Sequence, residues 1–163
     1  MARVEIPEPY LTAWRAFLNA HAATTEHVEA ALAAADLPPL AWYDVLWPLY
    51  DARRLRMGEL ATRVVTISRS GLTRLVDRVE AAGLVRREAC DHDRRGTDLV
   101  LTAAGKAMLR RMWPVYARVI EERFVAVIGR REAEELADTL GRVGARAPAA
   151  EPTASSVRRP ALQ

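Results

Sequence analysis

The chain has 163 residues, of which half are hydrophobic and 28% are charged, a composition typical of a compact protein with a real core. No apolar stretch approaches the roughly 20 residues that a membrane helix needs, and the acidic, proline-containing start lacks the pattern of a secretory signal. The single cysteine, Cys90, cannot form an internal disulfide. We therefore expect a cytoplasmic protein that does not enter a membrane.

The positive charge is concentrated in the middle of the chain. Residues 53–111 carry 14 basic and 7 acidic side chains, whereas the rest of the chain carries 10 basic and 14 acidic ones. A localised basic segment is typical of a protein that binds a polyanion, although a solvated arginine-rich surface would have the same composition.

Two helices are expected before the basic segment. The first begins at Pro9, and apolar residues then recur at three- and four-residue steps until about Asp36. It should end there because two prolines follow. The second helix spans about residues 40–52 and is rich in aromatic side chains. Pro48 lies inside it and should kink it or end it early.

The basic segment predicts two short helices followed by a hairpin. After the basic stretch 53–56, a helix is expected over 58–64, and a tight connection leads to a second helix over 69–82. Ser68 is the expected N-cap of this second helix, and Gly83 suits the left-handed position after its end.

Two strand-like segments follow, over 84–89 and 98–101, and the polar run 90–97 should join them as a hairpin. Thr102 is the expected N-cap of a long helix that runs to about Ile128, with a bend at Pro114.

Gly129 should end this long helix, and a last helix is expected over 131–143. From Gly144 the composition changes to Ala, Pro, Ser and Arg, which predicts a disordered tail.

The second helix of the central pair has one apolar and one polar side. Its apolar residues can pack on Leu60 and Ala61, while its other side is basic and small. Two short helices joined by a tight turn can place such a side in the major groove of DNA, where arginines reach guanine edges or phosphates. An ordinary helical hairpin with a polar outside is the alternative. The candidate DNA contacts are Ser68, Arg69, Ser70, Thr73, Arg74 and Arg78.

The hairpin tip supports the same interpretation. Arg94 and Arg95 lie in a loop that could reach a narrow minor groove, where the negative potential is strongest. Asp93 would repel phosphate and is better placed to orient an arginine. Taken alone, this loop could equally be a solvated surface turn.

Three segments together resemble the MarR-type winged-helix regulators. They are MGELATRV at 57–64, SRSGLTRLVDRVEAAGLVRR at 68–87, and DRRGTDLVLTAAG at 93–105. The flanking helices fit the same layout, so the resemblance covers about residues 9–143.

The resemblance implies a mostly α fold with a small β-hairpin wing, a recognition helix over 68–82 and wing arginines at Arg94 and Arg95. It implies a winged helix-turn-helix lobe over 53–102, dimerisation and support helices over 9–52 and 103–143, and leaves a tail over 144–163. It also implies a homodimer that binds an inverted-repeat duplex operator. Many such proteins are repressors that release DNA when a small, often aromatic, ligand binds.

A ligand site is suggested by aromatic residues in the segments that would line it. Aromatic walls with a few polar groups suit a small organic molecule, but aromatic residues at helical spacing also form cores and dimer interfaces. The candidates are Trp14, His21, Trp42, Tyr43, Trp47, Trp113 and Tyr116.

Other functions have weaker support. The contiguous run Cys90–Asp93 has ligand-type side chains, yet neighbours in sequence rarely all face one ion and no second cluster exists, so neither a metal nor another cofactor is expected. Cys90 near arginines could be a redox-sensing thiol. No Ser-His-Asp ordering, phosphate loop or paired carboxylate indicates an enzyme. A dimeric adaptor that binds protein instead of DNA remains an alternative.

Overall fold

The computed structural model describes residues 5–64, 67–90 and 93–145, with the side chains of 90 and 93–96 outside the described part. The chain forms helices with one small sheet. In order, the elements are α1 (Glu8–Ala34), α2 (Leu40–Ala52), β1 (Arg54–Arg56), α3 (Met57–Arg63), α4 (Arg69–Ala81), β2 (Val85–Cys90), β3 (Asp93–Leu101), α5 (Ala103–Ile120), a π-helical turn η1 (Glu121–Val125) and α6 (Arg130–Ala145).

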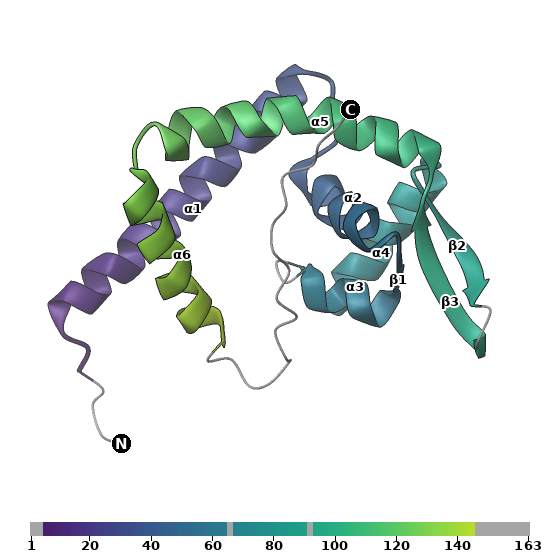
Figure 1. The fold of residues 1–163 in the computed structure, drawn as a ribbon, viewed down its shortest axis with the longest axis horizontal. Coiled ribbons are helices and arrows are strands. Elements are labelled where there is room, and N and C mark those ends of the chain that lie inside the picture. The colour runs from purple at the N-terminus through teal and green to yellow at the C-terminus, as the bar shows by residue number, and fades with distance from the viewer. Residues whose placement is uncertain (1–4, 65–66, 91–92, 146–163) are drawn as a thin grey trace.

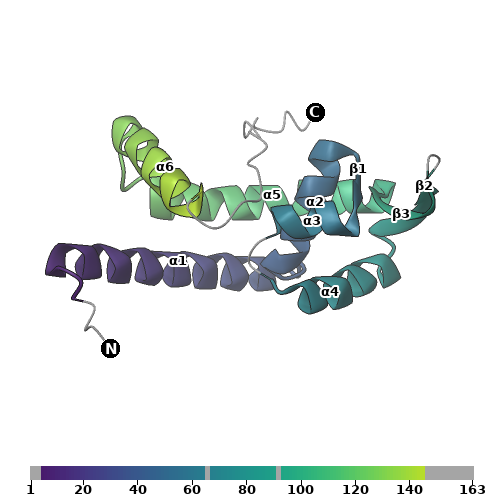
Figure 2. The same ribbon diagram turned by 90° about the horizontal axis from the view of Figure 1, so that it is seen from below.

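The two long helices α1 and α5 run side by side in opposite directions and form an arch (Figures 1 and 2). At one end of the arch lies a lobe made of α2, β1, α3, α4 and the β2–β3 hairpin. At the other end, α6 turns back from the end of α5, and Figure 2 shows it on the side of α5 away from α1. Within the described ranges, no helix is both long and apolar enough to cross a membrane.

The sheet has three antiparallel strands in the order β1-β3-β2, so β3 is central. Leu55 of β1 lies opposite Leu99 of β3, and Val85 of β2 lies opposite Leu101. These four side chains are buried, which fixes the register because a shift by one residue would expose them.

The core lies in the lobe. Val45, Leu46 and Leu49 of α2 are completely buried, as are Leu60 of α3 and Val76 of α4. Each such side chain stabilises the fold by about 1.5–3 kcal/mol relative to an exposed one. By contrast, α6 contains no buried residue, so its apolar side chains are not part of this core.

The structure confirms most predicted elements and corrects several boundaries. The basic stretch 53–56 contains a strand, β1, that the sequence did not reveal. The strand β3 begins at Asp93, so the hairpin loop is much shorter than 90–97. The long C-terminal helix ends at Ile120 and continues as the turn η1.

Pro48 does not end α2, which continues to Ala52. An internal proline costs about 3 kcal/mol through its missing donor and its ring. The burial of Val45, Leu46 and Leu49 on both sides of the proline outweighs this cost. The predicted bounds of 40–52 are therefore confirmed, and of the two effects expected of Pro48 the early end does not occur.

Candidate DNA-binding surface

The helices α3 and α4 form the helix-turn-helix, and both begin at a local cap. The Glu59 carboxylate accepts a hydrogen bond from the Arg56 backbone N–H at 2.7 Å, at the start of α3. The Ser68 hydroxyl accepts a hydrogen bond from the Gly71 backbone N–H at 3.2 Å, as predicted for the N-cap of α4. Two residues of the connection between the helices, 65 and 66, lie outside the described residues.

The outer face of α4 is exposed as the sequence predicted. Its apolar side is buried in the core, through Leu72, Leu75, Val76 and Val79. No carboxylate of the described residues pairs with Arg69, Arg74 or Arg78. These guanidinium groups are therefore available to an anionic partner. The exposed candidates are Ser68, Arg69, Ser70, Thr73, Arg74 and Arg78.

The hydroxyl groups on this face are partly engaged within the helix. The Thr73 hydroxyl donates to the Arg69 carbonyl oxygen at 3.1 Å, and the Ser68 and Ser70 hydroxyl oxygens are 3.4 Å apart. Because phosphate oxygens accept but do not donate hydrogen bonds, the arginines are the stronger donors toward a nucleic acid.

Asp77, the acidic residue on the outer face, is neutralised by the neighbouring strand. The Arg87 guanidinium on β2 donates to the Asp77 carboxylate at 2.7 Å, and it also pairs with Glu80. The hydrogen bond to Asp77 is the main cause that raises the pKa of Arg87. The recognition helix α4 therefore presents cationic side chains without an uncompensated carboxylate among them.

The wing is the β2–β3 hairpin, but its predicted contact side chains lie outside the described residues. These are Arg94, Arg95 and Asp93, and their backbone belongs to β3. The pairing jumps from Ala89–Thr97 to Cys90–Asp93, so Arg94 and Arg95 fall within an irregularity of the ladder.

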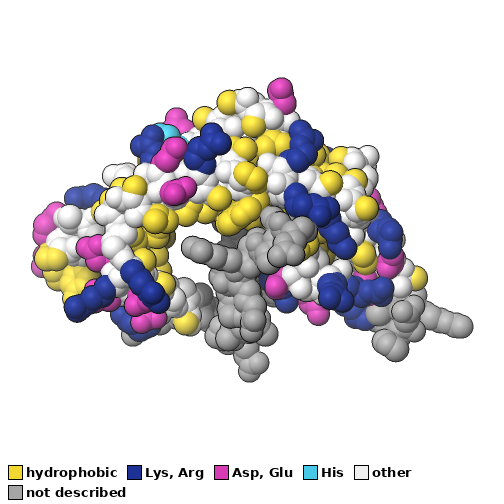
Figure 3. Space-filling model, turned by 45° about the horizontal axis from the view of Figure 1, so that its top comes forward, with side chains coloured by type: hydrophobic (Ala, Val, Ile, Leu, Met, Phe, Trp, Pro, Cys, Tyr) yellow, Lys and Arg dark blue, Asp and Glu magenta, His cyan; other side chains and the backbone are white. Residues whose placement is uncertain are grey.

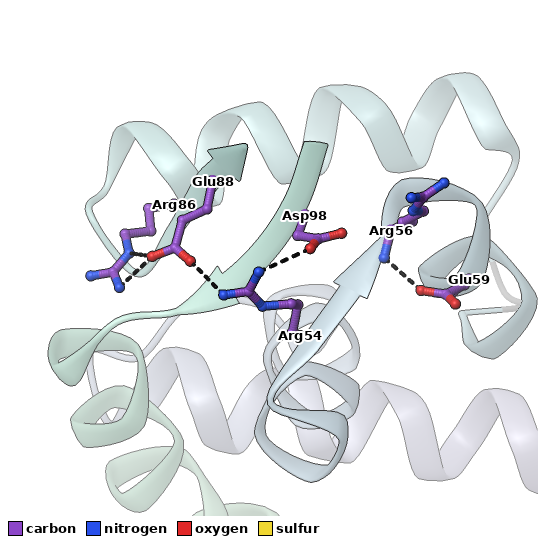
Figure 4. A network of polar contacts seen from close by, with 6 residues as sticks. All are labelled: Arg54, Arg56, Glu59, Arg86, Glu88 and Asp98. Atoms are coloured by element: carbon purple, nitrogen blue, oxygen red, sulfur yellow. Dashed lines mark hydrogen bonds and ion pairs between the residues drawn. The ribbon is translucent and has the colours of Figure 1, made fainter. Parts of the chain in front are cut away.

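The base of the wing contains a charged network that the sequence did not reveal (Figure 4). The Arg54 guanidinium of β1 donates to the Asp98 carboxylate of β3 at 3.2 Å and to the Glu88 carboxylate of β2 at 3.0 Å. Glu88 also pairs with Arg86. The Asp98 side chain is only 7% exposed, so Arg54 supplies the charge that keeps this buried carboxylate satisfied.

Further basic side chains are exposed in the first half of α5, at Lys106, Arg110 and Arg111. Figure 3 shows Lys and Arg side chains at both ends of the face in view, interleaved with Asp and Glu, while hydrophobic side chains follow the inner edge of the arch.

Four of the aromatic ligand candidates form one cluster where α2 and α5 meet. The Tyr43 ring is buried and contacts the rings of Trp47, Trp113 and Tyr116, with centroid separations of 6.2, 6.4 and 5.1 Å. Tyr50, which the sequence analysis did not select, stacks on Trp47.

The other three candidates do not join this cluster through a ring contact among the described residues. Trp14 is 54% exposed on α1 and contacts Phe17 instead. His21 is also exposed on α1, and Trp42 packs partly buried against the core. An open hollow of about 490 Å³ lies elsewhere, lined by Thr139, Arg142, Val143 and Ala145 of α6.

A carboxylate lies beside the aromatic cluster. Burial raises the pKa of Asp44, and the nearby Glu29 adds to the effect. The pKa of Tyr116 is also raised. Burial is the larger cause, and the negative charge of Asp44 is the smaller one. Glu29 itself accepts a hydrogen bond from the Leu40 backbone N–H at 3.1 Å, which holds the start of α2 against α1.

Apolar side chains are exposed at the end of the arch opposite the lobe. They belong to the first half of α1, to η1 and the residues after it, and to α6. The largest are Ile6, Tyr10, Trp14, Phe17, Leu18, Phe124, Val125, Val127, Leu136, Leu140 and Val143. Singly exposed apolar residues are ordinary, but a set gathered at one end of a molecule is typical of an interface.

The run Cys90–Asp93, which the sequence analysis considered as a metal site or a redox thiol, lies outside the residues whose side chains are described. Among the described residues, no group of three or more His, Cys, Asp or Glu side chains could hold a metal ion.

The chain matches a family model for the MarR family over residues 35–96. It is 30% identical over 102 residues to the HTH-type transcriptional regulator MhqR of Bacillus subtilis (strain 168), covering 63% of this chain and 69% of that protein.

Solved structures agree with this family match. Sco3205, a MarR family transcriptional regulator from Streptomyces coelicolor in complex with DNA, superposes with a TM-score of 0.78 at 30% identity, over 86% of this chain and 92% of that one.

The fold is also shared with a mutant MarR from E. coli complexed with operator DNA, with a TM-score of 0.72 at 21% identity, over 86% of this chain and 99% of that one. The family expected from the three sequence segments is thereby confirmed, together with the winged-helix fold. Both MhqR and Sco3205 are transcriptional regulators. This chain belongs to the MarR family of DNA-binding transcriptional regulators.

Proposed function

We propose that this regulator is a cytoplasmic homodimeric repressor that binds an inverted-repeat operator and leaves it when a small aromatic molecule binds. The observation that carries the DNA-contact part of the proposal is the exposed outer face of α4, where Arg69, Arg74 and Arg78 lie without carboxylate partners among the described residues. Arginines on a recognition helix contact guanine edges and phosphates in the major groove.

In the proposed complex, each subunit places α4 in a major groove and its wing in the flanking minor groove. Arg69 and Arg74 contact bases or phosphates, and Ser68, Ser70 and Thr73 add shorter contacts. Arg94 and Arg95 enter the minor groove, with Asp93 orienting them. The two recognition helices lie about one helical turn apart, roughly 34 Å, which requires an operator with two-fold symmetry.

Residues 53–102 act as the DNA-binding lobe, and residues 9–52 and 103–143 act as its support and as the dimer contact. The exposed apolar side chains of α1, η1 and α6 support this division, because they lie at the end of the arch away from the lobe. In a homodimer, the same patch of each subunit meets its copy.

The effector part of the proposal is supported by the aromatic cluster of Tyr43, Trp47, Trp113 and Tyr116 at the contact of α2 with α5. This contact joins the lobe to a dimer helix, so a ligand that separates the rings would move the lobe. The ligand can shift DNA affinity only if it binds one arrangement better than the other.

The test begins with fragments of the source genome selected by the purified protein. Binding to a selected duplex is then measured at several salt concentrations, because neutralised phosphates release counterions and give a steep salt dependence. We expect one sequence to be preferred over bulk DNA. Equal binding to all duplexes, or no binding at low salt, would contradict the proposal.

The regulatory parts need separate measurements. A promoter carrying the selected operator should be less active in a reporter strain when the protein is present, and higher activity would contradict repression. Aromatic acids and phenols are then added to the purified complex. Lower DNA affinity with at least one of them supports the effector site, whereas unchanged affinity with the whole set contradicts this aromatic class.

A further inference from the structure

The recognition helix and the wing are joined by a very short connection. The helix α4 ends at Ala81 and the strand β2 begins at Val85. Within this turn, the Gly83 and Leu84 backbone N–H groups donate to carbonyl oxygens in the last turn of α4, at 2.8 and 3.1 Å. Gly83 has φ of 74°, a left-handed conformation that glycine adopts without steric cost.

A turn of this kind fixes the chain path but not the angle of the hairpin. The strand β2 spans six residues, so its far end lies about 16 Å from its start, at 3.3 Å per residue. A rotation of about 15° at the turn would move that far end by about 4 Å, more than the length of a hydrogen bond. The pairing of β3 with β1 and the buried Val85, Leu99 and Leu101 hold the base of the hairpin, so a second attachment is needed to hold its outer part at one angle to α4.

Arg87 provides this second attachment. Its guanidinium donates to the Asp77 carboxylate at 2.7 Å and to the Glu80 carboxylate, which lie three residues apart on α4. Its backbone N–H also donates to Glu80, at 3.0 Å. Because β2 is an edge strand, the carboxylate of Glu80 satisfies a backbone donor that the sheet does not use. One residue of the wing thus makes three bonds to the recognition helix.

We propose that Arg87, Asp77 and Glu80 form a clamp that sets the angle of the wing relative to the recognition helix and so determines how well the chain fits its operator. These residues are positioning residues and act through the wing arginines. The inference rests on the proposed DNA contacts of α4 and the wing.

The proposal predicts an effect opposite to that of simple electrostatics. Replacing a carboxylate of the lobe with an amide removes a negative charge near DNA, which by itself should strengthen binding to phosphate. If the clamp acts, Glu80→Gln should instead weaken operator binding by about tenfold, the size expected when the contacts of one wing arginine are lost. Asp77→Asn should change binding in the same direction.

The matched control is Asp51→Asn. Asp51 lies at the end of α2 in the same lobe and pairs with Arg63 at 3.6 Å, but it has no bond to the described part of the wing. This variant makes the same change of charge and should bind the operator as tightly as the unchanged protein, or slightly more tightly. Arg87→Lys keeps the positive charge but loses the planar fork that holds two carboxylates, so it should bind more weakly.

A double-mutant cycle tests the route of action. If Glu80 acts through the wing, adding Glu80→Gln to Arg95→Ala should lower the operator affinity little further. Adding Glu80→Gln to Arg74→Ala should lower the affinity by the sum of the two single effects. Binding is measured by fluorescence anisotropy on the selected operator. Circular dichroism of each variant checks that it is folded. If Arg87→Lys does not fold, Asp77→Asn tests the clamp in its place, because the Asp77 side chain is 55% exposed and its replacement disturbs no core packing.

The outcomes separate this inference from the proposed function. If neither Arg74→Ala nor Arg95→Ala weakens binding, the proposed DNA contacts are wrong. If they do weaken binding while Glu80→Gln and Asp77→Asn bind as tightly as Asp51→Asn, the clamp is overturned. Full additivity of Glu80→Gln with Arg95→Ala would overturn it as well.

Discussion

Gly105 lies at the start of α5, where the helix packs against the turn between the recognition helix and the wing. A Cβ atom at this position would lie 2.1 Å from the Leu84 carbonyl oxygen and 2.6 Å from a methyl carbon of Leu101. The same Leu84 carbonyl accepts hydrogen bonds from the backbone and the hydroxyl of Thr102, so it cannot move freely. Glycine is therefore required here for close approach.

We expect Gly105→Ala to lower the free energy of unfolding by about 1–3 kcal/mol, because overpacking must displace the backbone of the turn. Urea denaturation followed by circular dichroism measures the loss. The control is Gly141→Ala on α6, where a Cβ atom would meet nothing within 4 Å. That variant should gain about 0.5–1 kcal/mol, since alanine favours a helix over glycine. Equal stabilities of the two variants would contradict the steric argument.

Arg74 has a different role at the same scale, because it lies on the exposed face of α4. We expect Arg74→Ala to weaken operator binding by about 1–3 kcal/mol without changing the fold. Arg130→Ala is the matched control, since Arg130 is 93% exposed on α6 and far from the lobe in the fold. Equal operator affinities of the two variants in a titration would remove Arg74 from the interface.

At the scale of elements, α2 combines a packed core side with a partly buried acid. Burial and the neighbouring Glu29 raise the pKa of Asp44 above the ordinary value of about 3.9 that it would have in the unfolded chain. The folded state therefore disfavours the charged carboxylate, and this cost is complete at neutral pH. As the pH falls through the raised pKa toward about 4, the folded chain takes up the proton first and the cost disappears.

Asp44→Asn should accordingly be more stable than the unchanged protein at pH 7, and the difference should shrink toward zero as the pH falls below about 4. Thermal unfolding of both proteins across this pH range gives the measurement. Contributions from acids that do not interact with Asp44 cancel in the difference, so Glu29 is the one neighbouring acid that the comparison retains. A gap that is constant with pH would show that the amide acts by packing and not through titration.

Elements also differ in how far local sequence determines them. Ser68 and Thr102 cap α4 and α5 as predicted, with the backbone N–H three residues ahead donating to each hydroxyl. Both signals act within one helical turn, so they can be recognised without knowing the fold. The strand β1 could not be recognised, because it has three residues and exists only through its pairing with β3.

At the scale of the whole molecule, α6 has an apolar stripe that the described residues of its own chain leave exposed. Leu136 and Leu140 are four residues apart and lie on one side of the helix, and both are exposed. A helix that buries nothing loses its main source of stability, because isolated helices are marginal in water. A second subunit would supply the missing contact.

We expect Leu140→Lys to shift the protein from dimer to monomer in light scattering after gel filtration, and to weaken operator binding because the two half-sites are no longer bound together. Asp138→Lys introduces the same residue on the opposite side of α6 and should remain dimeric. If Leu140→Lys also remained dimeric with full operator affinity, this stripe would not be part of the subunit contact.

The sequence by itself determined the helix-turn-helix, its caps, the exposed arginines of α4 and the family. Those signals repeat over three or four residues or lie within one continuous segment, so local geometry is enough to interpret them. Only the tertiary structure decided which charged side chains form ion pairs with one another. Arg54 finds Asp98 44 positions further along the chain, and Arg87 joins Asp77 and Glu80 only because the chain turns back at Gly83. Side chains far apart in sequence meet through the packing of whole helices and strands. No local sequence pattern therefore encodes which of several arginines will pair with a given carboxylate.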